Sequence, residues 1–207
     1  RQHWMIIIIL LFASWLRFYQ IENQVLFEYD EQYNVQLVYN LLVNGKISLV
    51  GQEMSFGGMF LGPWHYLFLV PFLWITKLHP IGAYYAEATI GLIAIGSYYW
   101  IGQKLFNRNV GLLAAFFRSI TFAGLAIDRA VSPAYPSELV ALWFIYLLIR
   151  FYQGHQTSLI FLSLLFGLMF TVHLSILPLA VVWLIVAIWK RPIKLTAKLS
   201  ALSLMAF

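Results

Sequence analysis

The longest apolar stretch of the chain is IGAYYAEATIGLIAIGSYYWI, residues 81–101. A helix needs about 20 mostly apolar residues to cross the hydrocarbon core of a bilayer, and this stretch is long enough. Similar runs lie on both sides of it, and five or six such spans fit into the chain. The sequence therefore predicts an all-α fold, a polytopic bundle of transmembrane helices. The other runs are Trp4–Phe18, Trp64–Ile75, Val110–Ala126, Leu139–Tyr152, Leu159–Val172 and Ile176–Trp189, with a further one beginning near Leu195.

The composition does not suit a soluble domain. Of the 207 residues, 62% are hydrophobic and 10% are charged, whereas a soluble domain carries about a quarter charged residues. The eight Trp and twelve Tyr suit the headgroup region of a membrane. The net charge is +5, but Lys and Arg stand singly between apolar runs, so we expect no nucleic-acid partner. The absence of cysteine excludes disulfides and thiolate metal sites.

The distribution of Lys and Arg predicts the orientation of the chain in the membrane. The basic cluster at residues 190–194 is expected on the cytoplasmic side. Counting back along the runs places residues 19–80 in a first outer loop and residues 127–137 in a second one, provided that Trp64–Ile75 does not fully cross. That run is short and contains Pro71, which favours a re-entrant or interfacial segment. A full crossing there is the alternative, and it would reverse the orientation of everything downstream.

With this orientation, the acidic residues gather on the outer face or at its boundary. Because acidic residues contribute little to the orienting rule, their segregation indicates that the outer face carries the function. An amphipathic pattern from Tyr33 to Val43 also predicts a juxtamembrane helix in the first outer loop. The acidic residues are Glu22, Glu28, Asp30, Glu31, Glu53, Glu87, Asp128 and Glu138.

Asp30 and Glu31 are the first candidates for chemistry. A carboxylate pair just outside a membrane helix could accept a proton, bind a metal or hold a cation. Alternatively, Asp30 could simply cap a helix that begins at Glu31, and the residues alone leave both interpretations open. Neighbouring side chains point about 100° apart on a helix. We therefore expect one catalytic and one structural residue.

Asp128 and Arg129, in the second outer loop, are the second candidates. Such a pair is either a local ion pair that anchors the interface or part of a site opposite Asp30, where it would add a second carboxylate and a guanidinium suited to a phosphate. His65 and Lys46 are further candidate phosphate contacts, although their spacing is not distinctive.

Two other polar residues lie in or next to apolar runs. For His173, at a helix end, we favour an ordinary hydrogen bond to the backbone or an interfacial position. Arg118 lies inside an apolar run and is costly there unless it pairs, but the sequence offers no partner for it. The chain has no phosphate loop, no dinucleotide-binding glycine motif and no H-E-x-x-H. Any transferred group would therefore arrive on a carrier other than a nucleotide.

Several segments resemble one known family. FEYDEQY at 27–33, followed by NLLVNG at 40–45, resembles the opening of GT-C-fold glycosyltransferases. The protein O-mannosyltransferase-like and aminoarabinose-transferase-like branches are the most similar. GPWHYL at 62–67 and GLMFTVHLS at 167–175 resemble later segments of the same family, in the same order. The resemblance implies that residues 1–207 are the N-terminal part of a GT-C-like transmembrane domain, and we expect the C-terminal remainder to be absent.

The resemblance also implies an activity. A sugar would move from a polyprenyl-phosphate carrier to a lipid, glycan or protein acceptor, with inversion and with Asp30 as the base. The site would lie on the outer or periplasmic side of a cell membrane, or in the lumen of the endoplasmic reticulum. A divalent metal, Mg or Mn, bridging Asp30 and Asp128 is left open. The candidate catalytic residues are Asp30, Glu31 and Asp128, and the candidate substrate or phosphate contacts are Arg129, His65, Lys46, Tyr29 and His173.

Two other classes of protein remain as alternatives. A transporter or channel would place ionisable residues deep within helices, whereas those of this chain lie mostly at helix ends or in loops. A non-catalytic membrane subunit would keep Asp30 and Asp128 far apart. The family branches that carry a lysine before the aromatic segment also differ from this chain, which has Leu61-Gly62-Pro63 there.

Overall fold

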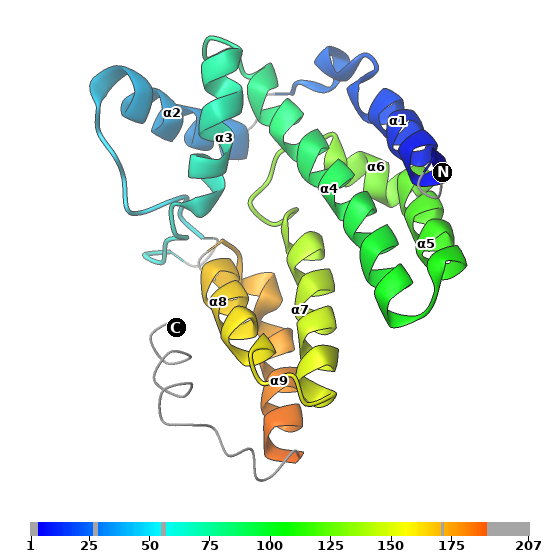
Figure 1. Ribbon diagram of the computed structural model, residues 1–207. Helices are drawn as coiled ribbons and strands as arrows, with labels where there is room; N and C mark the ends of the chain where they lie inside the picture. Colours follow the sequence, from blue (N-terminus) through cyan, green and yellow to red (C-terminus); the bar gives the residue numbers. More distant parts are fainter. Residues whose placement is uncertain (1–3, 27–28, 55–56, 171, 190–207) are drawn as a thin grey trace. The chain divides into compact units, whose positions relative to one another are not determined.

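The computed structural model describes residues 4–26, 29–54, 57–170 and 172–189 (Figure 1). The side chain of Asp30 lies outside this description, as do the side chains of residues 166, 169, 170, 180, 184 and 187–189. Helices and their connections make up the described residues, with one isolated β-bridge between Glu53 and Phe60. The all-α prediction is therefore confirmed for this part of the chain. The predicted basic cluster at 190–194 and the run near Leu195 fall outside it.

The helices follow the apolar runs closely, and two of them begin and end at the residues where the runs do. A helix is also present where the pattern from Tyr33 to Val43 predicts one, and its position at a membrane surface stays a prediction. It begins at Tyr29, so Asp30 lies within its first turn rather than in front of a helix that begins at Glu31. The elements are α1 (Trp4–Phe18), η1 (Ile21–Gln24), α2 (Tyr29–Asn44), α3 (Trp64–Ile75), α4 (Ile81–Leu105), α5 (Arg108–Ile120), α6 (Phe122–Asp128), α7 (Ser137–Tyr152), α8 (Ser158–Phe170), η2 (Leu174–Ile176) and α9 (Leu177–Trp189).

The run Val110–Ala126 forms two helices instead of the single one that its apolarity predicts. α5 and α6 meet at 66°. The break falls at Thr121, whose backbone is extended and whose hydroxyl donates to the Phe117 carbonyl at 2.6 Å. Among the described helices, none has by itself the length and apolarity of a membrane span, while the bent pair α5 and α6 has them when taken together.

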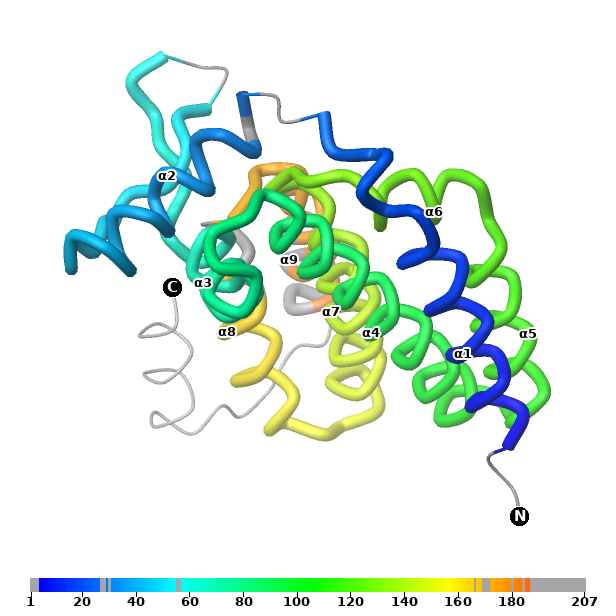
Figure 2. Tube along the Cα trace, turned by 90° about the horizontal axis from the view of Figure 1, so that it is seen from above, coloured from blue at the N-terminus to red at the C-terminus, as the bar shows by residue number. Residues whose placement is uncertain are grey.

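The chain divides into two compact units, Arg1–Leu139 and Val140–Phe207. In the first unit, α4 is the central helix and packs against α1, α3, α5 and α6, while α2 lies against α3 (Figures 1 and 2). A buried cluster that includes Tyr66, Leu69 and Leu73 joins α3 to α4. The second unit has its own core, in which Phe144 of α7 packs with Leu162 of α8.

Candidate functional site

The start of α2 forms one wall of a polar cavity in the first unit. Glu31 is buried there, and its Oε1 accepts a hydrogen bond of 3.2 Å from the hydroxyl of Tyr84 on α4. The same hydroxyl accepts a 3.0 Å bond from the backbone N–H of Leu26. Tyr84 therefore fixes both the approach to α2 and the orientation of the Glu31 carboxyl group.

The cavity has a volume of about 380 Å³. Its far wall is the connection between α6 and α7, at Ala130, Val131, Ser132 and Tyr135. Tyr29, a predicted substrate contact, lines it as well. Residues from both predicted outer loops, Glu31 from the first and residues 130–135 from the second, therefore line one cavity. That Asp30 and Asp128 share a catalytic site stays a prediction. The polar side chains of the lining are Gln24, Tyr29, Glu31, Tyr84, Ser132 and Tyr135.

His65 of α3 is buried and contacts both α2 and α4. Its Nε2 lies 2.9 Å from Oε1 of Glu87 on α4, and its Nδ1 lies 3.2 Å from Oδ1 of Asn34 on α2. Asn34 in turn donates to the Gln52 side chain at 3.2 Å. Both ring nitrogens are engaged, so contact with a phosphate would require one of these bonds to break. The role of His65 in phosphate binding stays a prediction.

The group of Asn34, His65 and Glu87 connects α2 to α3 and α4. Asn34 stands four residues after Asp30, which is one helical turn along α2. The bond from Asn34 to His65, together with the pair of His65 and Glu87, therefore ties the turn that carries Asp30 to α3 and α4.

Asp128 is bound by two arginines of other helices. Arg17, at the end of α1, donates from Nε to Oδ2 at 2.8 Å. Arg118 of α5 donates to both oxygens, at 2.9 and 2.8 Å, and also forms a bidentate pair with Glu138 at 2.7 and 2.8 Å. The expected local pair of Asp128 with Arg129 is not formed, because Asp128 faces the helices. Arg118, for which the sequence offers no partner, has two.

Two glycines make room for this cluster. A Cβ atom at Gly91 of α4 would meet the carboxyl group of Asp128, and one at Gly124 of α6 would meet the guanidinium of Arg118. The two glycines therefore allow the close approach that the ion pairs need. The pairs of Arg118 with Asp128 and Glu138 are charge-assisted and bidentate, which places them in the stronger class of hydrogen bonds.

Arg129 binds the end of α1 rather than an acid. Its guanidinium donates to the carbonyls of Leu16, Tyr19 and Gln20, at 3.1, 3.0 and 3.4 Å. A cation is favoured at a helix C-terminus, where the last carbonyls of the helix lack intrahelical partners.

Lys46 and His173 are the two remaining candidates. Lys46 is exposed just after α2. His173 belongs to the second unit, where its Nδ1 accepts a 3.1 Å bond from the backbone N–H of Ser175. That bond agrees with the ordinary backbone role that we expect for His173.

A divalent metal does not fit at Asp128. Both oxygens of this carboxylate are occupied by guanidinium groups, and the described residues contain no cluster of three His, Asp or Glu side chains placed to hold a metal. A contribution from Asp30 stays a prediction, since its side chain is outside the description.

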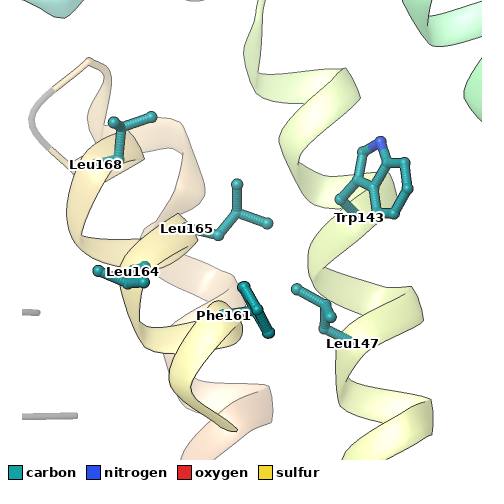
Figure 3. Close-up of a pocket in the computed structure, with 6 residues that line it drawn as sticks. All are labelled: Trp143, Leu147, Phe161, Leu164, Leu165 and Leu168. Atoms are coloured by element: carbon teal, nitrogen blue, oxygen red, sulfur yellow. The ribbon is translucent and has the colours of Figure 1, made fainter. Parts of the chain in front are cut away.

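A second cavity, of about 320 Å³, lies in the second unit between α7 and α8. Figure 3 shows its six side chains, among which Leu147 and Phe161 extend into the space between the two helices. Every lining residue is apolar or aromatic, so the cavity offers contact for apolar groups but no acid or base. The lining residues are Trp143, Leu147, Phe161, Leu164, Leu165 and Leu168.

The family model described as dolichyl-phosphate-mannose-protein mannosyltransferase matches residues 62–207, more than two thirds of the chain. The chain belongs to this family. The resemblance to GT-C-fold glycosyltransferases is thereby confirmed, and membership supports a membrane glycosyltransferase in general. Comparisons with curated proteins and with solved structures found no match. The family match includes His65, Glu87 and Asp128, and it begins after Asp30 and Glu31.

Sequence reasoning missed several residues of this arrangement. The sequence did indicate that Glu87 needs a partner, because an acid inside an apolar run is costly unless it pairs. The same holds for Arg17 at the end of its run. No sequence feature singled out Tyr84, since a tyrosine near a helix start is common at membrane interfaces.

Proposed function

We propose that this protein transfers a sugar from a polyprenyl-phosphate carrier to an acceptor on the outer face of a membrane, with inversion and with Asp30 as the base. The observation that supports it most is the family match, combined with the polar cavity that borders the first turn of α2. Many large apolar side chains are also exposed, which suits contact with lipid. Examples are Ile7, Ile8 and Leu11 of α1, Phe117 of α5, Phe122 of α6, and Val181 and Ile185 of α9.

The reaction needs one base and one leaving group. The acceptor hydroxyl attacks the anomeric carbon from the face opposite the phosphate, and Asp30 takes its proton. The bond between that carbon and the phosphate oxygen breaks, and its electron pair leaves with the lipid phosphate. General-base assistance is typically worth about 10²–10⁴-fold. No step in this sequence requires a metal.

The departing phosphate gains negative charge, so a cation near it would stabilise the transition state. The candidates are Arg129, Lys46 and His65. Among them, Lys46 is exposed, whereas Arg129 is engaged with carbonyls and His65 is buried. We therefore place Lys46 first.

The transporter alternative predicts ionisable residues deep within helices, and Glu87 and Arg118 are buried in this way. Each of them is paired, however: Glu87 with His65, and Arg118 with Asp128 and Glu138. Ionisable groups held by fixed partners suit a structural role better than an ion path.

The test is sugar transfer by the full-length protein in detergent, with dolichyl phosphate mannose as the donor. Asp30→Asn is expected to lower the rate by about 10²–10⁴-fold with unchanged expression. Glu22→Gln is the matched control, since Glu22 is an exposed acid of the same loop and should retain wild-type activity. An Asp30→Asn variant with near-normal transfer would show that another group is the base.

A further inference from the structure

The Glu31 carboxyl group is incompletely satisfied. Its side chain belongs to a residue that is only 6% exposed, and Oε1 receives the Tyr84 hydroxyl. Oε2 is buried and has no hydrogen-bond partner among the described residues. A buried acceptor without a donor carries the full penalty of its desolvation, so a donor from outside the chain would stabilise this arrangement.

The cavity that Glu31 lines has the size of a small-molecule site. Its volume of about 380 Å³ is near the lower end of the range for ligand pockets, about 300–1,000 Å³, which suits a single sugar ring better than an oligosaccharide. Tyr29 and Tyr135 also line it, and their rings provide flat apolar faces for the C–H side of a sugar. Tyr84 is already held by Leu26 and Glu31.

The charge of the cavity discriminates between the two halves of a lipid-linked sugar. No Lys, Arg or His is among its described lining residues, and Glu31 is an acid. A phosphate would meet a like charge there, whereas sugar hydroxyls would supply the donor that Oε2 lacks. The phosphate is therefore expected outside the cavity.

We propose that this cavity binds the sugar ring of the lipid-linked donor, and that Glu31 selects it by accepting a hydrogen bond from a ring hydroxyl. The proposal rests on the proposed function for the identity of the donor. It assigns Glu31 to sugar recognition and leaves proton transfer to Asp30.

The experiment is a set of binding measurements on the full-length protein in nanodiscs. The ligands are dolichyl phosphate mannose, its four monodeoxyfluoro analogues and dolichyl phosphate without a sugar. Fluorine accepts but does not donate, so a carboxylate rejects it at the position of the hydroxyl that it binds. The proteins are the wild type, Glu31→Gln, whose amide can donate to fluorine, and the control Glu22→Gln.

In the wild type, at least one analogue is expected to bind about ten- to a hundredfold more weakly than the parent ligand, the effect of losing a charged hydrogen bond. In Glu31→Gln that ratio should fall to about threefold or less, while dolichyl phosphate binds both proteins equally. The control should retain the wild-type ratio.

Three results would overturn the proposal: equal binding of all analogues to the wild type, an equal loss of dolichyl phosphate and its mannosyl form in Glu31→Gln, or no binding of any ligand. If Glu31→Gln does not fold, the analogue series on the wild type still decides. Failure of the base assignment is seen separately, because active Asp30→Asn would leave these binding ratios unchanged.

Discussion

Asp128→Asn is expected to destabilise the protein by about 3–5 kcal/mol, because breaking a buried ion pair by removing one partner leaves an uncompensated charge. Asp128 accepts three bonds of 2.8 to 2.9 Å from Arg17 and Arg118, and the side chains of Arg17 and Asp128 are 0% and 4% exposed. Asparagine keeps the shape of the side chain, but it removes the charge that both guanidinium groups share. For a protein of this size, 1 kcal/mol shifts the unfolding temperature by about 2–4 °C, so the expected fall is about 6–20 °C.

The assay is thermal unfolding of the full-length protein in nanodiscs, followed by the fluorescence of its tryptophans, together with sugar transfer measured well below the transition. Arg17→Met should be similarly destabilising, and the double variant less so than the sum, by about 0.5–3 kcal/mol, because the two side chains contact each other. Arg150→Met, at a partly exposed arginine of α7, is the control and should change stability by at most about 0.5 kcal/mol.

A stable but inactive Asp128→Asn variant would indicate a catalytic role for Asp128. An Asp128→Asn variant that unfolds within about 2–4 °C of the wild type, a change of about 1 kcal/mol, and has nevertheless lost sugar transfer would refute the structural role. It would favour the catalytic role that the resemblance implies for this residue.

Two further substitutions test the packing around α4, both by thermal unfolding in nanodiscs. Glu87→Gln should destabilise by about 3–5 kcal/mol if it breaks a charged pair with His65, and a loss below about 1 kcal/mol would mean that His65 is neutral there. Gly91→Ala should destabilise by about 1–3 kcal/mol, since its Cβ would overlap the carboxyl group of Asp128. Gly96→Ala is its matched control on the same helix, where nothing lies within 4 Å, and a loss at Gly96 equal to that at Gly91 would contradict the steric explanation.

Apolar patterning was enough to predict the helices, because each apolar run must bury or cover its own surface. The runs Trp4–Phe18 and Trp64–Ile75 became α1 and α3 without a change of boundary. The break between α5 and α6 was not predictable, since it depends on Thr121 turning the chain so that Asp128 reaches Arg118. Apolarity alone carries no information about such a turn.

The partners of the charged side chains could not be predicted from the sequence either. Arg17 and Asp128 are 111 residues apart, and His65 and Glu87 are 22 residues apart. A charged residue inside an apolar run indicates that it needs a partner, but the sequence does not identify that partner. The neighbouring Arg129 was the natural choice for Asp128, and it binds the carbonyls at the end of α1 instead.

The three polar arrangements of the first unit share one scaffold, a single face of α4. Tyr84 holds Glu31, Glu87 holds His65, and Gly91 leaves the space for Asp128. Their spacing of three and then four residues places all three on the same side of a helix. The polar cavity, the turn that carries Asp30 and the arginine cluster are therefore not independent. A rotation or shift of α4 would disturb all three at once.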